Sequence, residues 1–313
     1  MRVEIYCPLQ KKQWDDFVRN SKNGTFLLLR DYMDYHRDRF IDNSLLVFDD
    51  KEQLIALLPA NKKDGELISH GGLTYGGFVT NELMKTDLML KIFELILTYL
   101  KENNFSKLIY KPVPHIYHLF PSEEDLYALF RFKAVLYRRD ISSTISLANK
   151  VNYQERRLRA VKKATAKNVT CKYSTDLAGY WKILEENLAS VHDVKPVHNL
   201  AEIEILCRSF PESIKLFGSF LNGSMIAGTL IYETERVAHA QYIASSTLGR
   251  SVGALDLLFN FLLSETYFNK PFFDFGIATE EQGMVLNFGL MDFKEGLGGR
   301  AIAYDFYEMR VES

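Results

Sequence analysis

One order of predicted elements occurs twice along this chain, and this repeat limits the folds that the sequence can adopt. Each copy runs strand, turn, strand, strand, glycine-bearing turn, long helix, strand. The first copy spans residues 44–113 with its long helix at 83–103, and the second spans residues 215–277 with its helix at 255–267. The repeat therefore predicts a duplicated α/β unit.

Length, charge and cysteine content narrow the class of protein. The 313 residues are enough for two domains that each bury a core. The net charge of −2 gives no overall attraction to nucleic acid or to an anionic membrane. The three widely spaced cysteines, Cys7, Cys171 and Cys207, predict neither a disulfide framework nor a metal cluster. Because the N-terminus lacks the apolar core of a signal peptide and no apolar run could span a membrane, we expect a cytoplasmic protein.

A basic and strongly helical segment, residues 152–167, separates the two copies. We place the domain boundary at its start, which predicts an N-terminal domain of residues 1–150 and a C-terminal domain of residues 151–313. Most predicted strands follow one another through short connections, with helices interspersed. This order predicts two twisted mixed α/β sheets with helices on their faces.

Four segments in this order resemble the acetyltransferase fold called GNAT, in particular its Fem-type branch, which carries two such folds in tandem. They are SHGGLTYGGFV (69–79), ERRLRAVKKATAKNV (155–169), the long helix after HAQYIASS, and the run from FFDFG to KEGLGG (272–299). The resemblance covers nearly the whole chain. It implies two GNAT-like domains and an acyltransferase related to peptidoglycan bridge transferases and to acyltransferases of cell-envelope gene clusters. A long helical-hairpin arm, associated with tRNA handling in some of those enzymes, has no counterpart here.

The segment LGRSVGALDLLF, residues 248–259, is the predicted donor site. An acyl-CoA enzyme must hold a pyrophosphate, which a glycine-bearing turn at a helix start can bind through free backbone N–H groups. Arg250 and Gly253 fit the pattern of the GNAT family, whereas Leu255 stands where that pattern has a small residue. An ordinary helix start, with Asp256 favourable to the helix dipole, is the alternative interpretation. The candidate CoA-binding residues are Ser245, Arg250, Ser251, Gly253 and Ala254.

Lys294 and Asp274 are the predicted catalytic residues. The ammonium of Lys294 could stabilise the oxyanion of a tetrahedral intermediate or bind a substrate carboxylate, and the Fem-type resemblance implies that a lysine of this segment contributes to the site. Asp274 lies in an apolar strand, where burial would raise the pKa of a carboxylate toward the range of a general base. A solvated lysine at a helix end and a structural aspartate are the alternatives. Other candidate bases are His70, His239, Glu280 and Glu281.

Two further segments are candidates for substrate binding. Arg156 or Arg157 of the basic helix could bind the phosphates of an anionic acceptor bidentately, as the resemblance also implies. A solvated helix face is the alternative, and RNA binding is a third, weakened because the helix lacks interleaved aromatic residues. Tyr75 and Gly76 lie in a glycine-rich loop that could line a ligand, with a β-turn or bulge as the alternative.

Together these patterns predict an N-acyltransferase that moves an acyl group, acetyl first among them, from acyl-CoA to an amine of a cell-envelope precursor such as an amino sugar nucleotide. The amine would attack directly, without a covalent enzyme intermediate. One alternative is a Fem-type aminoacyltransferase that uses aminoacyl-tRNA and acts on a muropeptide precursor; another is a degenerate module that only binds an anionic ligand. We expect a small-molecule or lipid-linked anionic acceptor as partner, tRNA as a weaker one, and no metal, since no metal-binding spacing is present.

Overall fold

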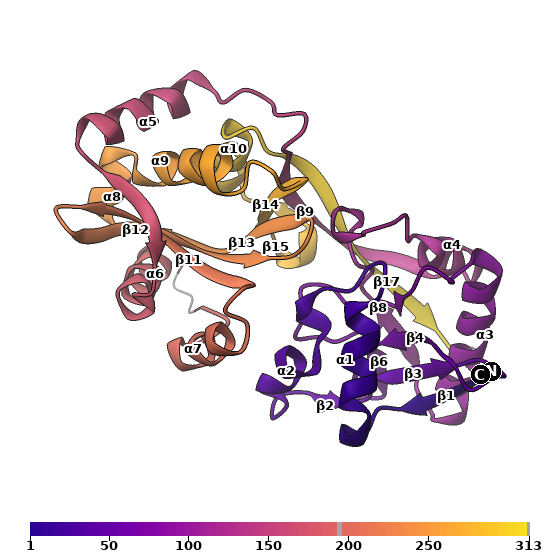
Figure 1. The fold of residues 1–313 in the computed structure, drawn as a ribbon. Helices are drawn as coiled ribbons and strands as arrows, with labels where there is room; N and C mark the ends of the chain where they lie inside the picture. Colours follow the sequence, from indigo (N-terminus) through magenta and orange to yellow (C-terminus); the bar gives the residue numbers. More distant parts are fainter. Residues whose placement is uncertain (193–195, 312–313) are drawn as a thin grey trace. The chain divides into compact units, whose positions relative to one another are not determined.

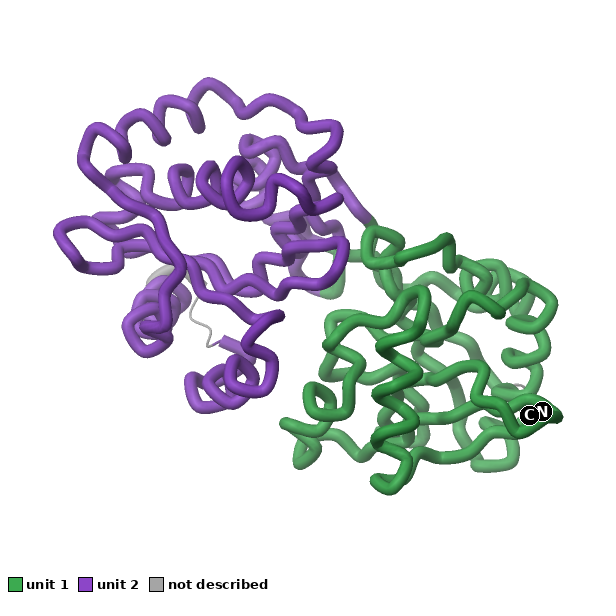
Figure 2. Tube along the Cα trace, in the orientation of Figure 1, with its two compact units in different colours: residues 1–140, 282–284, 303–313 green, residues 141–281, 285–302 purple. Residues whose placement is uncertain are grey.

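The computed structural model describes residues 1–192 and 196–311, which form two compact units (Figure 2). Unit 1 contains residues 1–140, 282–284 and 303–313, and unit 2 contains residues 141–281 and 285–302. The chain passes from unit 1 to unit 2 at Asp140 and Ile141, inside a strand, and its last strand returns to unit 1. Each unit therefore contains its own copy of the predicted repeat.

Unit 2 is built on a mixed sheet with the strand order β10, β11, β12, β13, β14, β9 (Figure 1). The strands are β9 (Val135–Ser146), β10 (Thr170–Ser174), β11 (Ile214–Leu221), β12 (Ser224–Glu233), β13 (Val237–Ser245) and β14 (Phe272–Ile277). Neighbours are antiparallel except for β13 and β14, which pair in parallel. That pairing joins 237–239 to 272–274, beyond which β13 continues to Ser245 and the two strands separate.

Helices cover both faces of this sheet (Figure 1). One face carries α5 (Glu155–Ala166), α9 (Ala254–Phe261) and α10 (Phe288–Gly296), and the other carries α6 (Leu177–His192) and α7 (Leu200–Ser209). The short α8 (Thr247–Val252) connects β13 to α9, which continues into a π-helical turn at Leu262–Thr266. A small hairpin, β15 (Thr279–Glu280) and β16 (Val285–Leu286), precedes α10.

Aromatic side chains join α9 to the sheet of unit 2. Phe259 of α9 contacts both Phe273 and Phe275 of β14, with ring centroids 5.9 and 5.0 Å away. Because side chains alternate along a strand, Asp274 between these two phenylalanines points to the opposite face of the sheet, the face on which α6 lies against β12 and β13.

Unit 1 has a four-stranded sheet in the order β1, β3, β4, β7, and a second set of strands in the order β17, β8, β6, β5, β2. The strands are β1 (Arg2–Ile5), β2 (Ile41–Asp42), β3 (Leu45–Phe48), β4 (Leu54–Leu58), β5 (Asn61–Lys63), β6 (Glu66–Ile68), β7 (Val79–Thr80), β8 (Lys107–Tyr110) and β17 (Arg300–Arg310). The α-helices are α1 (Lys11–Arg19), α2 (Arg30–Met33), α3 (Thr86–Glu102) and α4 (Glu124–Arg131). Single 3-10 turns lie at Pro8–Gln10, Phe26–Leu28, Asp34–His36, His115–Tyr117 and Glu281–Gly283.

The two units share one connection that confirms the duplication. In unit 1 the parallel strands β6 and β8 are joined through α3, and in unit 2 the parallel strands β13 and β14 are joined through α8 and α9. In both cases a helix connects two parallel strands, and the neighbouring strands of the sheet are antiparallel. The predicted mixed α/β class with a duplicated unit is therefore correct.

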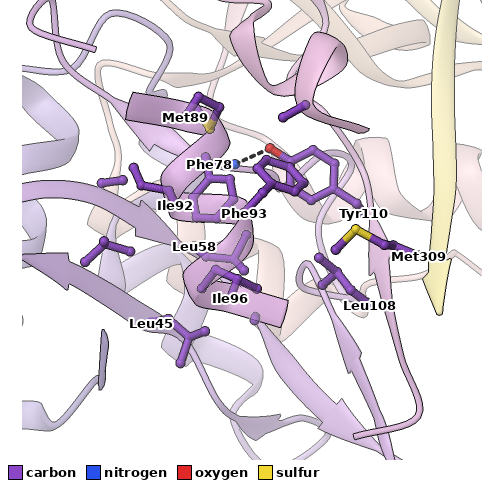
Figure 3. Close-up of a cluster of buried hydrophobic side chains, with 14 of the residues drawn as sticks. Leu45, Leu58, Phe78, Met89, Ile92, Phe93, Ile96, Leu108, Tyr110 and Met309 are labelled. Carbon is purple, nitrogen blue, oxygen red and sulfur yellow. Dashed lines mark hydrogen bonds between the residues drawn. The ribbon is translucent and has the colours of Figure 1, made fainter. Parts of the chain in front are cut away.

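The core of unit 1 packs the apolar face of α3 against its strands (Figure 3). Phe93 and Ile96 of α3 lie among Leu58, Leu108 and other fully buried side chains. A buried polar contact crosses this core, because the hydroxyl of Tyr110 accepts a hydrogen bond of 2.7 Å from the backbone N–H of Phe78. Such a satisfied polar group fixes the register of an otherwise apolar core.

Two local predictions differ from the structure. The sequence pattern indicates two separate strands at residues 134–137 and 144–147, but the structure has one strand, β9, over residues 135–146. The middle of this strand is polar and contains paired residues such as Arg139, which binds Asp305 at 2.6 Å. The helix α10 has no counterpart among the predicted elements. In the described part of the chain, no helix has the length and hydropathy to cross a membrane.

Candidate functional site

A pocket of about 310 Å³ in unit 2 brings together most of the predicted donor residues. Its wall contains residues 243–245 of β13, in the part of that strand that β14 no longer accompanies. Four of the five candidate CoA-binding residues line it, together with one predicted for acceptor binding: Ser245, Arg250, Gly253, Ala254 and Arg157. Ser251 does not line the pocket; it is exposed, and its hydroxyl donates a hydrogen bond of 2.8 Å to the carbonyl of Leu248.

The pocket is lined from both faces of the sheet. Asn187 belongs to α6 on one face, whereas Arg157 of α5 and Phe293 of α10 belong to the other. Side chains from opposite faces can meet at one pocket where adjacent strands have separated. The pocket therefore lies beside the part of β13 that β14 no longer accompanies, and residues from both faces of the sheet line it.

The predicted donor turn is the junction of α8 and α9. The hydroxyl of Ser246 caps α8 by accepting a hydrogen bond of 3.0 Å from the N–H of Gly249. Gly253 ends α8 in the left-handed conformation, with φ 82°, and a Cβ there would lie 2.7 Å from the carbonyl oxygen of Ala160 in α5. Gly253 is thus required for the packing of α9 against α5, whatever ligand the pocket takes.

Arg250 and Arg157 point charged groups at the pocket. Arg250 donates a hydrogen bond of 2.8 Å to the backbone carbonyl of Ser245 and another to the side chain of Asn187. The guanidinium of Arg157 lies 4.7 Å from the ring centre of Phe293 and 3.2 Å from the carboxylate of Asp256. Burial raises the pKa of Asp256, and the charge of Arg157 opposes that rise. The pocket therefore carries two cations and one buried anion.

Arg156, the other predicted acceptor residue, has a different environment from Arg157. Its side chain is half-exposed, pairs with the carboxylate of Asp292 and donates a hydrogen bond of 2.8 Å to the side chain of Gln154. It does not line the pocket of unit 2.

Asp274 is completely buried and serves as a hydrogen-bond acceptor. The hydroxyls of Ser142 and Thr144 on β9 donate to it at 2.5 and 2.8 Å, and Nδ1 of His239 on β13 lies 2.8 Å away. Burial alone would raise the pKa of Asp274, but the hydrogen bond and the electrostatic interaction with His239, together with the hydrogen bonds of the two hydroxyls, outweigh burial and lower the pKa to about 2. At neutral pH this side chain is therefore an ionised acceptor with no contact to solvent.

Lys294 is buried on α10 next to the end of β14. Its Nζ donates hydrogen bonds of 2.8 and 2.7 Å to the backbone carbonyls of Gly276 and Ile277. Burial lowers the pKa of Lys294 to about 8, and the negative charge of Asp274 partly offsets that shift. An ammonium has three donors, so one N–H of Lys294 has no hydrogen-bond partner among residues 1–192 and 196–311.

Tyr75 and Gly76 belong to unit 1 and are buried there. The Tyr75 hydroxyl lies 2.9 Å from the hydroxyl of Thr25, and its ring packs on Tyr117 at 4.7 Å. Gly76 donates its N–H to the carbonyl of Lys111, and a Cβ at Gly76 would lie 2.3 Å from a backbone oxygen of Ser69. These contacts hold the glycine-rich loop inside unit 1.

Sequence reasoning missed several residues of the pocket. Asn187, Ile243, Leu290 and Phe293 line it, yet each lies in a segment whose pattern indicates only an amphipathic helix or an apolar strand. Asn287 is the signal that could have predicted the helix at 288–296, which carries Leu290 and Phe293. Its side chain caps this helix by accepting a hydrogen bond of 3.0 Å from the N–H of Leu290.

Comparison with known proteins identifies the fold. No protein-family model and no curated protein sequence matches the chain. Among solved structures, FemX has a TM-score of 0.69 at 12% identity, over 99% of this chain and 97% of FemX. The structure of L-PGS from Bacillus licheniformis has a TM-score of 0.64 at 12% identity, over 99% of this chain and 93% of that one. A tandem GNAT protein from the clavulanic acid biosynthesis pathway has a TM-score of 0.52 at 10% identity, over 100% and 99% of the two chains. The chain therefore has the tandem GNAT fold that it shares with FemX, as the sequence resemblance predicted.

Proposed function

We propose that this protein is an N-acyltransferase whose donor binds in the unit 2 pocket. The observation that carries the proposal is the position of that pocket: it opens where β13 and β14 separate, and the predicted donor turn lines it. A donor held in such a gap can present its acyl carbonyl to an amine that arrives from the other face of the sheet. Holding both reactants in this way removes much of the entropic barrier to a bimolecular reaction.

The first candidate donor is acyl-CoA, and acetyl-CoA is the first acyl-CoA to test. Arg250 and Arg157 supply two cations at the pocket, which favours a ligand with phosphate groups. The similarity of the whole chain to a tandem GNAT protein supports the same donor class.

Aminoacyl-tRNA is the second candidate donor, and Asp256 favours it. This buried carboxylate lies in the pocket wall at the first turn of α9, where it would repel a pyrophosphate but attract the ammonium of an aminoacyl group. The similarity in fold to FemX and to L-PGS adds support for aminoacyl transfer.

We propose that Lys294 stabilises the negative charge that develops during acyl transfer and that Arg156 binds the acceptor. The unpartnered N–H of Lys294 could donate to the oxyanion of the tetrahedral intermediate. The half-exposed guanidinium of Arg156 suits a phosphate of an anionic cell-envelope precursor, such as an amino sugar nucleotide or a lipid-linked precursor. The similarity to FemX and to L-PGS is the support for an envelope acceptor, and a cytoplasmic location would fit such a substrate.

The test follows release of the CoA thiol from acetyl-CoA in the presence of UDP-linked amino sugars, and in parallel the deacylation of tRNAs charged with labelled amino acids. Wild-type turnover with either donor is expected, and Lys294→Met should lower it about 10²–10³-fold. Lys270→Met is the matched control, because Lys270 also donates to two backbone carbonyls, of Thr234 and Glu235, but lies before the start of β14, whereas Lys294 bonds to the end of that strand. No turnover with any donor, or equal turnover in both variants, would contradict the proposal.

A further inference from the structure

The contact between His239 and Asp274 involves neither of the residues proposed for the donor phosphates, Arg157 and Arg250. These two residues are register partners, and they form the last pair that joins β13 to β14. Beyond them the strands separate, and residues 243–245 of β13 line the donor pocket. The pair therefore lies at the start of the gap into which the acyl end of a donor would extend.

The hydrogen bonds of Asp274 fix which nitrogen of His239 carries a proton. The carboxylate accepts from the hydroxyls of Ser142 and Thr144, and it faces Nδ1 of His239 at 2.8 Å. Because an ionised carboxylate has no proton to donate, Nδ1 must be the donor in this contact. In the neutral imidazole, Nε2 is then the basic nitrogen with a free lone pair.

The surroundings of His239 leave this nitrogen accessible. The His239 side chain is 12% exposed, whereas Asp274 behind it is 0% exposed. Gly276 lies beside the ring, where a Cβ would stand 3.3 Å from Cε1 and 3.9 Å from Nε2, so the glycine leaves that edge of the imidazole uncovered. Within the described residues, Nε2 of His239 makes no hydrogen bond.

His239 also lies on the face of the sheet opposite to α9. Phe273 and Phe275 contact α9, so Asp274 between them points to the α6 face, and His239 contacts Asp274 there. A donor bound against α9 and α10 and an amine approaching from the α6 face would meet at the gap. A base on the α6 face is on the side of the attacking amine.

We propose that Nε2 of His239 is the general base of the acyl transfer and that Asp274 is a positioning residue that holds the imidazole in the Nδ1–H form. This inference rests on the proposed function. The amine nitrogen bonds to the acyl carbonyl carbon and gives one proton to Nε2. The bond from that carbon to the sulfur or oxygen of the donor then breaks, and the leaving thiolate or alkoxide takes the proton from the imidazolium.

The test uses the same thiol-release assay with acetyl-CoA and UDP-linked amino sugars. His239→Asn keeps an N–H donor for Asp274 and removes the base, so it should fold normally and lower kcat about 10²–10⁴-fold with little change in the KM for acetyl-CoA. His239→Ala should lose as much activity and regain part of it when free imidazole is added, a rescue that a purely structural role would not produce. His118→Asn is the control, since a ring nitrogen of His118 also makes a hydrogen bond, of 2.8 Å to the carbonyl of Val113, but His118 belongs to unit 1.

A second measurement does not depend on turnover. Nitrogen-15 NMR of the folded wild-type protein should show His239 as the Nδ1–H tautomer, and the Nε2–H tautomer would overturn the inference. If the wild type turns over and His239→Asn is as fast, the inference fails while the proposed function stands. If the wild type does not turn over with any donor, the proposed function fails and this inference fails with it.

Discussion

The guanidinium of Arg157 lies 3.2 Å from the carboxylate of Asp256, and both side chains form part of the wall of the unit 2 pocket. Both groups are largely buried, so each charge depends on the other for compensation. Arg157 therefore differs from its sequence neighbour Arg156, whose side chain is half-exposed and pairs with Asp292. The two arginines should therefore affect different substrates.

Arg157→Ala should weaken donor binding and destabilise unit 2. Loss of one partner leaves Asp256 as an uncompensated buried anion in the pocket, which should repel donor phosphates and cost about 1–3 kcal/mol of folding free energy. Calorimetric titration with acetyl-CoA and denaturant unfolding measure the two effects. Arg159→Ala on the exposed side of the same helix should change neither, and Arg156→Ala should raise only the KM of the acceptor. If Arg157→Ala binds acetyl-CoA as tightly as the wild type does, Arg157 does not contribute to donor binding.

Gly253→Ala should destabilise the protein more than Gly223→Ala does. The two glycines have nearly the same positive φ, 82° and 81°, so both variants bear a conformational cost of about 1–2 kcal/mol. Only the alanine at 253 would meet a backbone atom, the oxygen of Ala160 at 2.7 Å, which should add about 1–3 kcal/mol. Denaturant unfolding of both variants gives the difference. Equal losses would show that Gly253 is not needed for the packing of α9 against α5.

The rate should fall as the pH rises above about 8, because Lys294 then loses the charge that it is proposed to supply. Burial lowers the pKa of Lys294 from 10.5 to about 8, so the ammonium is present below that pH and lost above it. The profile of kcat against pH should therefore have an alkaline limb near pH 8 in the wild type and in Lys270→Met, but not in the residual activity of Lys294→Met. If the alkaline limb of the profile is unchanged in Lys294→Met, the titration of another group causes it.

The same shift predicts how stability depends on pH. Between about pH 8 and 10.5 the unfolded chain binds a proton at Lys294 that the folded chain does not, so the free energy of unfolding should rise with pH over this window. The shift corresponds to a rise of about 3 kcal/mol at most. Lys294→Met should lack this rise, and unfolding curves at pH 8 and pH 10 measure it. A rise of the same size in both proteins would contradict the burial of this charge.

The sequence predicted the duplicated fold because strand and helix periodicities recur in the same order in both units. It also singled out the short local segment with Arg250 and Gly253, two residues that the structure places in the wall of the unit 2 pocket. Both signals are local, and local patterns survive in a single sequence.

The remainder of the site depends on contacts between distant segments. His239 and Asp274 meet through strand register, and Asn187 reaches the pocket from a helix whose pattern only indicates amphipathicity. The strand of Asp274 correctly indicated burial, but its hydrogen-bond donors on β9 lower a pKa that burial alone would raise. A pKa of this kind follows from tertiary partners that no local pattern contains.

Calorimetric titration of acetyl-CoA into the wild type, Leu290→Glu and Phe288→Glu tests the central claim most directly. Leu290 lines the pocket and is partly exposed, whereas Phe288 on the same helix is 78% exposed and does not line it. A carboxylate at 290 should repel donor phosphates and weaken binding at least tenfold, or about 1.4 kcal/mol, while Phe288→Glu should bind like the wild type. Wild-type protein that binds no acetyl-CoA, or equal affinity in Leu290→Glu, would contradict an acyl-CoA site in this pocket.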